Sequence, residues 1–91
     1  MHEPDARRYV LRVGGELAAA LDYTVSGSAV SFTRTYTAPH LRGRGFAAEI
    51  TQFATDDVEN NTDLRIVPMC WYVADWFERN PERAGLLTRG A

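Results

Sequence analysis

Apolar and polar residues alternate over the first part of the chain, which is the pattern of half-buried β-strands. Between residues 8 and 13, Tyr9, Leu11 and Val13 share one face, and residues 17–25 and 29–37 continue the same period of two. The pattern therefore predicts three strands. The positions predicted to share a face are Leu17, Ala19, Leu21, Tyr23 and Val25 in the second strand, and Val30, Phe32, Arg34 and Tyr36 in the third.

Short turns connect these three strands. Gly14 and Gly15 fit a type I′ turn, because both central positions of that turn need a positive φ. The run Ser26-Gly27-Ser28 supplies the second turn. We therefore expect an antiparallel meander.

A helical period follows the meander. One apolar stripe runs through the segment while Glu49, Gln52 and Glu59 face away from it, which predicts an amphipathic helix that ends at Asn60-Asn61. Asp57 falls inside the stripe, and we expect the helix to be leaving the sheet at that point. The predicted inward positions are Phe46, Ala47, Ile50, Phe53, Ala54 and Val58.

The last third of the chain predicts one more strand and a second helix. Residues 64–67 are short and β-branched, and a strand reached through a helix crosses over to lie parallel to its neighbour. The fourth strand is therefore expected beside the third, ending at Pro68. A helix follows Cys70 and ends at Asn80-Pro81. Its predicted inward residues are Val73, Trp76 and Phe77, and Leu86 and Leu87 are predicted to anchor the C-terminus.

Length, composition and charge limit the possible functions. A chain of 91 residues closes one core, so we expect a single domain over residues 1–91. The net charge of −2 gives no cationic field for nucleic acid, and no apolar run approaches the ~20 residues that a bilayer needs. Cys70 is the single cysteine, which excludes an internal disulfide. We therefore expect a cytoplasmic protein that binds neither nucleic acid nor a membrane, with no metal site indicated by the spacing of its ligand-type residues.

The segment Arg42–Ala47 carries the strongest chemical signal. It lies where a strand gives way to a helix, and the first N–H groups of a helix are free to bind an anion. Gly43 and Gly45 allow a close approach, while Arg42 and Arg44 supply charged donors. The chain has no lysine, which argues against a Walker loop. The alternative is a plain glycine turn with two solvated arginines.

In its context, this loop resembles the pyrophosphate loop Gln/Arg-x-x-Gly-x-Gly/Ala of the GNAT superfamily of N-acetyltransferases. Arg42, Gly45 and Ala47 occupy the three defining positions. The run Ile66-Val-Pro-Met-Cys70 and the run Asn80-Pro-Glu82 are similar to motifs of its small single-domain branch. Tyr36 and Asn80 stand where that branch has glutamate and histidine.

The resemblance implies an α+β fold, in which the three-stranded meander is followed by a β-α-β crossover, a splayed pair of parallel strands and a C-terminal helix. It also implies that acetyl-CoA is the cosubstrate and that an amine is the acceptor. The cofactor-binding residues implied are Tyr36, Thr37, Arg42, Gly43, Arg44, Gly45, Phe46, Ala47, Pro68, Met69, Cys70 and Asn80.

Two side chains are candidates for catalysis, each with a plainer alternative. Cys70 lies between a strand end and a helix start, so it is either an acyl-accepting nucleophile or a small residue that lines the pantetheine channel. Tyr72, or else Tyr36, is a candidate proton donor to the leaving thiolate, with packing as the alternative. His40 is either the partner of Cys70 in a catalytic dyad or a loop histidine near the phosphates.

The leading function is thus transfer of an acetyl group from acetyl-CoA to an amine, which is either a small amine or a protein or peptide amine. The alternatives are a module that binds acyl-CoA without turnover and a small interaction protein built on the same scaffold.

Overall fold

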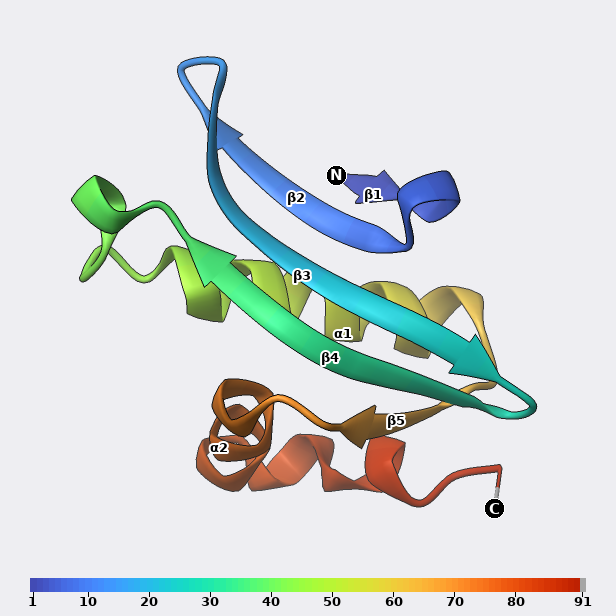
Figure 1. Cartoon of the computed structure of the whole chain (residues 1–91). Coiled ribbons are helices and arrows are strands. Elements are labelled where there is room, and N and C mark those ends of the chain that lie inside the picture. Colours follow the sequence, from blue (N-terminus) through green and yellow to red (C-terminus); the bar gives the residue numbers. More distant parts are fainter. Residues whose placement is uncertain (91) are drawn as a thin grey trace.

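Five strands form one mixed sheet in the computed structural model, which describes residues 1–90 (Figure 1). The strands lie in the order β1-β2-β3-β4-β5. Their bounds are β1 His2–Glu3, β2 Arg8–Val13, β3 Glu16–Ser26, β4 Ala29–Thr37 and β5 Arg65–Pro68. The helices are α1 Phe46–Asn61 and α2 Trp71–Arg79, with short 3-10 helices η1 Pro4–Ala6, η2 Pro39–Leu41 and η3 Pro81–Leu87.

The predicted α+β topology is confirmed. Strands β2, β3 and β4 are an antiparallel meander, and β5 is parallel to β4 after the α1 crossover. Gly14 and Gly15 have φ values of 59° and 82°, as the type I′ turn requires. The sequence pattern missed β1 and η1, because a two-residue strand is too short to show a period.

One face of the sheet carries the apolar core. Tyr9, Leu21 and Phe32 on the strands share this core with residues of α1, α2 and η3. The helical members of the core are Ile50, Ala54, Val58, Val73, Trp76, Phe77 and Leu86. Val73, Trp76 and Phe77 were the inward residues predicted for α2, so the amphipathic reading of that helix is confirmed.

A β-bulge changes which side chains of β4 face the core. Tyr23 pairs with Phe32, but the next residue back, Asp22, pairs with Arg34, so Thr33 is an extra residue in β4. Because an extra residue reverses the alternation, Arg34 and Tyr36 turn to the face opposite Phe32. The predicted common face for Val30, Phe32, Arg34 and Tyr36 is therefore wrong.

Strand β3 contains a second irregularity of the same kind. Leu11 pairs with Ala19 and Arg12 with Leu17, which leaves Ala18 as the extra residue. Ala18 is fully buried against Ala38 and Leu41. Leu17 was predicted to share the face of Ala19, and the bulge turns it to the opposite face, where it lines a cavity with Ala20. Ala19, Leu21 and Tyr23 lie in or against the core as predicted.

Two further apolar positions that were predicted to face inward are exposed. Val25 lies next to the last residue of β3, beside the β3–β4 turn, and it is exposed. Phe53 on α1 is 45% exposed and packs edge-on against Tyr9. Thr51 and Thr55 are buried in α1 instead. A threonine hydroxyl can bond to the preceding turn, as Thr51 Oγ1 does to the Ala47 carbonyl at 2.8 Å, so it escapes a purely apolar pattern.

The acidic residue inside the apolar stripe of α1 has a partner on the sheet. The Tyr9 hydroxyl donates a hydrogen bond of 2.7 Å to Asp57 Oδ2, and the Asn61 amide donates one of 2.8 Å to Oδ1. Burial, followed by the contact with Asp57, raises the pKa of Tyr9. The expectation that α1 leaves the sheet at Asp57 is therefore wrong, because this hydrogen bond holds the last turns of α1 to β2.

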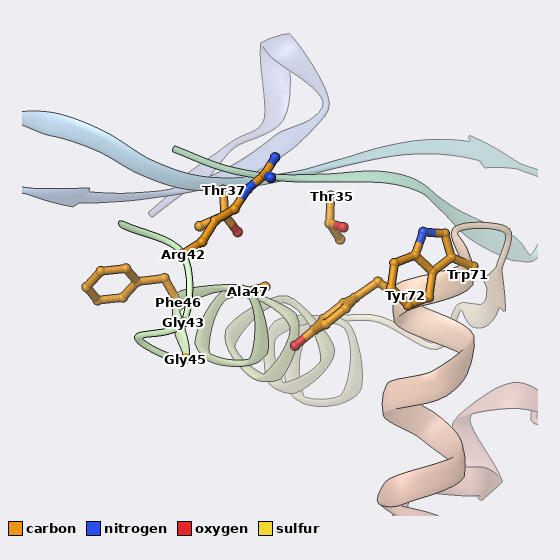
Figure 2. A pocket seen from close by; sticks show the side chains of 9 residues that line it. All are labelled: Thr35, Thr37, Arg42, Gly43, Gly45, Phe46, Ala47, Trp71 and Tyr72. Atoms are coloured by element: carbon orange, nitrogen blue, oxygen red, sulfur yellow. The ribbon is translucent and has the colours of Figure 1, made fainter. Parts of the chain in front are cut away.

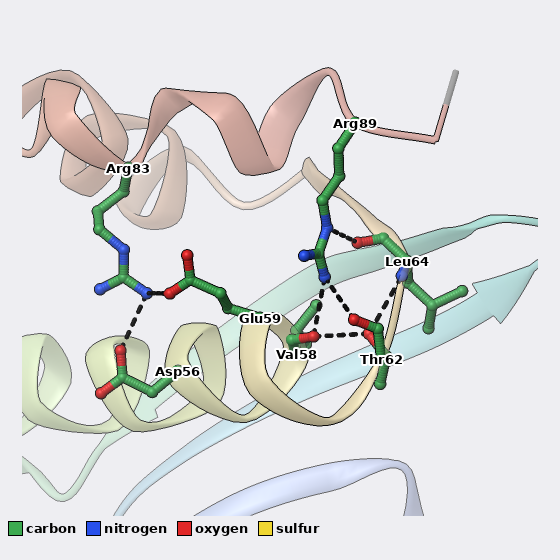
Figure 3. A network of polar contacts seen from close by, with 7 residues as sticks. All are labelled: Asp56, Val58, Glu59, Thr62, Leu64, Arg83 and Arg89. Carbon is green, nitrogen blue, oxygen red and sulfur yellow. Dashed lines mark hydrogen bonds and ion pairs between the residues drawn. The ribbon is translucent and has the colours of Figure 1, made fainter.

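The C-terminal segment is attached to α1 by two arginines (Figure 3). The Arg89 guanidinium donates to the carbonyl oxygens of Val58, Thr62 and Leu64 at 2.8–2.9 Å. Arg83 on η3 forms ion pairs with Asp56 and Glu59 at 2.9 and 3.1 Å. The last carbonyls of a helix have no partner within the helix, so Arg89 acts as a cap for the end of α1.

None of the helices formed by residues 1–90 combines the length and apolarity that crossing a membrane would demand.

Replacing Arg89 by methionine is expected to lower the free energy of unfolding by about 1–3 kcal/mol, because buried carbonyls lose a charged donor. Urea denaturation followed by circular dichroism measures the change. Arg79→Met is the matched control. It removes an exposed i,i+4 pair with Asp75 and should cost under about 0.5 kcal/mol. Equal losses in the two variants would contradict the capping role of Arg89.

Candidate functional site

Strands β4 and β5 part after four paired residues. The parallel register runs from Ala29 opposite Arg65 to Phe32 opposite Pro68 and then stops. The backbone N–H groups of Met69 and Cys70 both donate to the Phe32 carbonyl at 3.0 Å, and the chain then turns into α2. Residues 33–37 of β4 continue without a β5 partner, so this edge of the strand lies open.

The loop before α1 has the geometry expected from its glycines. Gly43 and Gly45 have φ values of 81° and 80°, which side chains rarely adopt. Gly45 is the N-cap residue of α1, and a Cβ added there would meet no atom within 4 Å. The N–H groups of Phe46, Ala47 and Ala48 donate to no backbone oxygen within residues 1–90. The start of α1 therefore presents free donors with open space above the loop.

A cavity of about 560 Å³ joins this loop to the open strand edge (Figure 2). Thr35 and Thr37 of β4 form one wall, and Trp71 and Tyr72 at the start of α2 form another. The bulge at Thr33 is what turns the two threonines toward this side. The loop residues that line the cavity are Arg42, Gly43, Gly45, Phe46 and Ala47.

The Cys70 thiol lies beside this cavity, at the N-cap of α2. Its sulfur is 3.6 Å from the hydroxyl of Thr35. Burial opposes ionisation of the thiol, but hydrogen bonds from the Thr35 hydroxyl and from the backbone of Val73, Tyr72 and Thr35 outweigh it, so the pKa of Cys70 is lowered. Cys70 is half-buried, so the sulfur is still accessible to a small reagent.

The structure gathers some of the predicted cofactor residues and separates others. Arg44 belongs to the same loop but is exposed and does not line the cavity. Pro68 and Met69 lie at the point where β5 leaves β4, and Met69 is exposed. Asn80 lines a neighbouring groove between α1 and α2, and its side-chain amide donates to the Trp76 carbonyl at 2.7 Å.

The other candidate side chains are divided between the two faces of the sheet. Tyr72 lines the cavity, and burial raises its pKa, so the phenol keeps its proton at neutral pH. The Tyr36 side chain is 38% exposed on the opposite face, so only its backbone is near the open edge of β4. His40 pairs with Glu16 on the β2–β3 hairpin at 2.8 Å and not with Cys70. The Cys70–His40 dyad is therefore absent from the described chain.

Two cavity residues were missing from the predicted set. Thr35 was not predicted, because its turn toward the cavity depends on a bulge that alternation does not reveal. Trp71 is not among the predicted inward residues of α2, and it is 78% exposed. Its position at the first residue of a helix, directly after Cys70, was the available signal.

A protein-family model matches most of the chain. The model described as GCN5-related N-acetyl-transferase matches residues 8–86. The chain belongs to the GCN5-related N-acetyltransferase family. No curated protein matches the sequence.

The matched range of this N-acetyltransferase family member includes every residue that lines the cavity. It begins at the first residue of β2 and ends at Leu86, the buried residue of η3, so β1 and the Arg89 cap lie outside it. Within residues 1–90, no group of three or more metal-ligand side chains converges.

The lowered pKa of Cys70 gives a testable pH profile. Alkylation by iodoacetamide should reach half its maximal rate at a lower pH in the folded protein than in the same chain unfolded in urea, because the fold stabilises the thiolate. Thr35→Val should move the folded midpoint to higher pH, while Thr35→Ser should restore it. Mass spectrometry of the single cysteine measures the rate. Coincident profiles for the folded and unfolded chains would contradict the assignment.

Proposed function

We propose that this protein is an acetyl-CoA-dependent N-acetyltransferase that moves an acetyl group to an amine. The observation that carries the proposal is the cavity that joins the loop before α1 to the open edge of β4, where the wall residue Thr35 contacts the Cys70 sulfur. Membership of the GCN5-related N-acetyltransferase family supports an acyltransferase.

The loop fits the diphosphate of coenzyme A. Free N–H groups of Phe46, Ala47 and Ala48 point out of the start of α1, where the helix dipole favours negative charge. Arg42 lines the cavity and forms no ion pair within residues 1–90, so its guanidinium is available to a phosphate. A side chain at Gly45 would occupy the space that the anion needs.

The open edge of β4 fits the pantetheine arm. Residues 33–37 have no β5 partner, and the peptide groups that face this edge would pair with amide groups of the arm. Thr35 and Thr37 supply a polar wall, and Trp71 and Tyr72 supply an apolar one. Bound acetyl-CoA supplies an acyl group activated as a thioester. The protein's part is to hold the arm straight beside Cys70 and to exclude water from it.

Two side chains near the cavity, Tyr72 and Cys70, are candidates for a chemical role in the transfer. Tyr72 keeps its phenolic proton, which it could donate to a departing thiolate from the cavity wall. Cys70 has a stabilised thiolate, but we assign it to lining the channel rather than to carrying the acyl group. His40 is bound to Glu16, so no histidine base stands beside the thiol in residues 1–90.

Binding of coenzyme A is expected to raise the melting temperature by 10 °C or more. At a hundredfold excess over Kd, mass action adds about 2.7 kcal/mol, and a domain of this size gains roughly 4–8 °C per kcal/mol. Gly45→Ala should reduce the CoA affinity at least tenfold, because a methyl group enters the diphosphate site. Differential scanning fluorimetry and calorimetric titration measure the two effects.

Gly15→Ala is the matched control for that experiment. Gly15 has a φ of 82° against 80° for Gly45, and an added Cβ meets no atom within 4 Å at either position. Both variants should therefore lose similar stability, while only Gly45→Ala loses affinity. If the melting temperature does not change at millimolar CoA, the protein binds no CoA, and the alternative of an interaction protein without cofactor is favoured. If CoA raises the melting temperature but no amine is acetylated, the alternative of a module that binds acyl-CoA without turnover is favoured.

The role of Cys70 is decided by substitution. If the amine attacks the thioester directly, Cys70→Ala keeps more than a tenth of the activity, since it loses only packing in the channel. Cys70→Ser should behave similarly. Initial rates of thiol release with an accepted amine measure this. An inactive alanine variant, together with an acetylated Cys70 peptide after incubation with acetyl-CoA alone, would establish a covalent intermediate instead.

A further inference from the structure

A second cavity lies on the face of the sheet opposite the core. It has a volume of about 250 Å³ and is lined only by strand and hairpin residues, from β2, β3 and β4. Leu17 and Ala20 form its apolar part, and no helix of residues 1–90 contributes to it. Its remaining lining residues are Arg8, Asp22, Arg34 and Tyr36.

The polar side chains of this cavity carry both signs of charge. Asp22 and Arg34 are cross-strand neighbours, yet neither forms an ion pair with any group in the described chain. Arg8 is held by Glu3 through its Nε at 2.8 Å, which fixes the direction of its guanidinium. Two guanidinium groups and one carboxylate around a small cavity match a ligand that itself carries a carboxylate and an ammonium group.

The bulge in β4 places this cavity beside the proposed site of acyl transfer. Arg34 and Tyr36 flank Thr35 in the sequence but point to the other face of the strand, while Thr35 contacts the Cys70 sulfur. The loop-side cavity occupies the core side of β4, so the opposite side is where a second substrate has room. Only the thickness of one strand separates the two cavities.

We propose that the Arg8–Asp22–Arg34–Tyr36 cavity binds the amino-acid head of a diamino acid, whose distal amine is the group acetylated. The inference rests on the acetyltransferase function proposed above. The carboxylate of the head pairs with Arg34 and Arg8, and its α-ammonium pairs with Asp22. Tyr36 supplies an apolar ring and a hydroxyl beside the side chain of the acceptor.

The position of Asp22 explains why a second amine is needed. Asp22 is on β3, one strand spacing of about 4.8 Å farther from the open edge than β4 is. An amine bound to Asp22 therefore cannot also reach the edge of β4 where the thioester is proposed to lie. A side chain of the length of ornithine or lysine crosses β4 and brings its terminal nitrogen there.

The transfer balances as follows. The terminal ammonium of the acceptor first releases one proton to solvent. Its nitrogen then forms a bond to the acyl carbon while the carbon–sulfur bond breaks, and the second proton lost by the nitrogen ends on the sulfur of coenzyme A. The products are the N-acetylated diamino acid and free coenzyme A.

The experiment compares acceptors that differ by one charged group. L-lysine and L-ornithine are set against 1,5-diaminopentane, which lacks the carboxylate, and 6-aminohexanoic acid, which lacks the α-amine. The better diamino acid should exceed both partial analogues at least tenfold in kcat/KM. In Arg34→Gln, the kcat/KM of the diamino acid should exceed that of diaminopentane only about twofold. In Asp22→Asn, it should exceed that of aminohexanoic acid only about twofold. Arg12→Gln, on the same face but outside the cavity, should change neither ratio.

Binding is measured separately, so that failure of catalysis does not hide the result. Titration of L-lysine into the CoA-saturated protein should shift the backbone amide signals of β3 and β4 around Asp22 and Arg34 in ¹⁵N spectra, and Arg34→Gln should abolish the shifts. Absence of such shifts, or equal use of diaminopentane and lysine, would overturn the assignment, as would acceptance of a peptide lysine with refusal of the free amino acid. Failure of CoA binding itself would instead refute the proposed function.

Discussion

The extra residue in β4 is the constraint on which the arrangement of the site depends. Thr33 reverses the alternation of the strand, so that Thr35 turns toward α1 and α2 while Arg34 and Tyr36 turn away. The Thr33 hydroxyl donates to the Asp22 carbonyl at 3.2 Å, which helps to satisfy a backbone group at the irregular step. Pairing of β4 with β5 stops one residue before the bulge. The bulge therefore sets both the open strand edge and the two faces that flank it.

The remainder of the fold keeps this open edge rigid. An unpaired strand edge is held in place only by what packs behind it, and here Phe32 and Ile66 are fully buried directly before the strands part. The Phe32 carbonyl accepts bonds from both Met69 and Cys70, which fixes the exit of β5. The other end of the crossover is held by Arg89. The point where β4 and β5 part is thus held by strand residues that pack on the core.

The sequence predicted the elements well because most of them follow a single period. The meander, α1, β5 and α2 were all correct, and the glycine loop was located at the start of α1. Alternation failed at the two bulges, since inserting one residue leaves the composition of a strand unchanged while reversing its faces. It therefore misplaced Leu17, Arg34 and Tyr36 and overlooked the turn of Thr35 into the cavity. Asp57 was misread because its partner, Tyr9, lies 48 residues away.

By the resemblance noted in the sequence, Tyr36 stands where the small single-domain branch has a glutamate. Tyr36 is on the face of β4 away from the loop before α1, so its side chain lies in the cavity where we propose that the acceptor binds. A carboxylate there would face Asp22 across a small cavity and repel it, whereas a phenol leaves Asp22 free to bind a cation. The arginine at position 34 then offsets the charge of Asp22 without forming an ion pair with it. Tyr36 and Arg34 together therefore fit the proposed recognition of an acceptor head that carries both an ammonium and a carboxylate group.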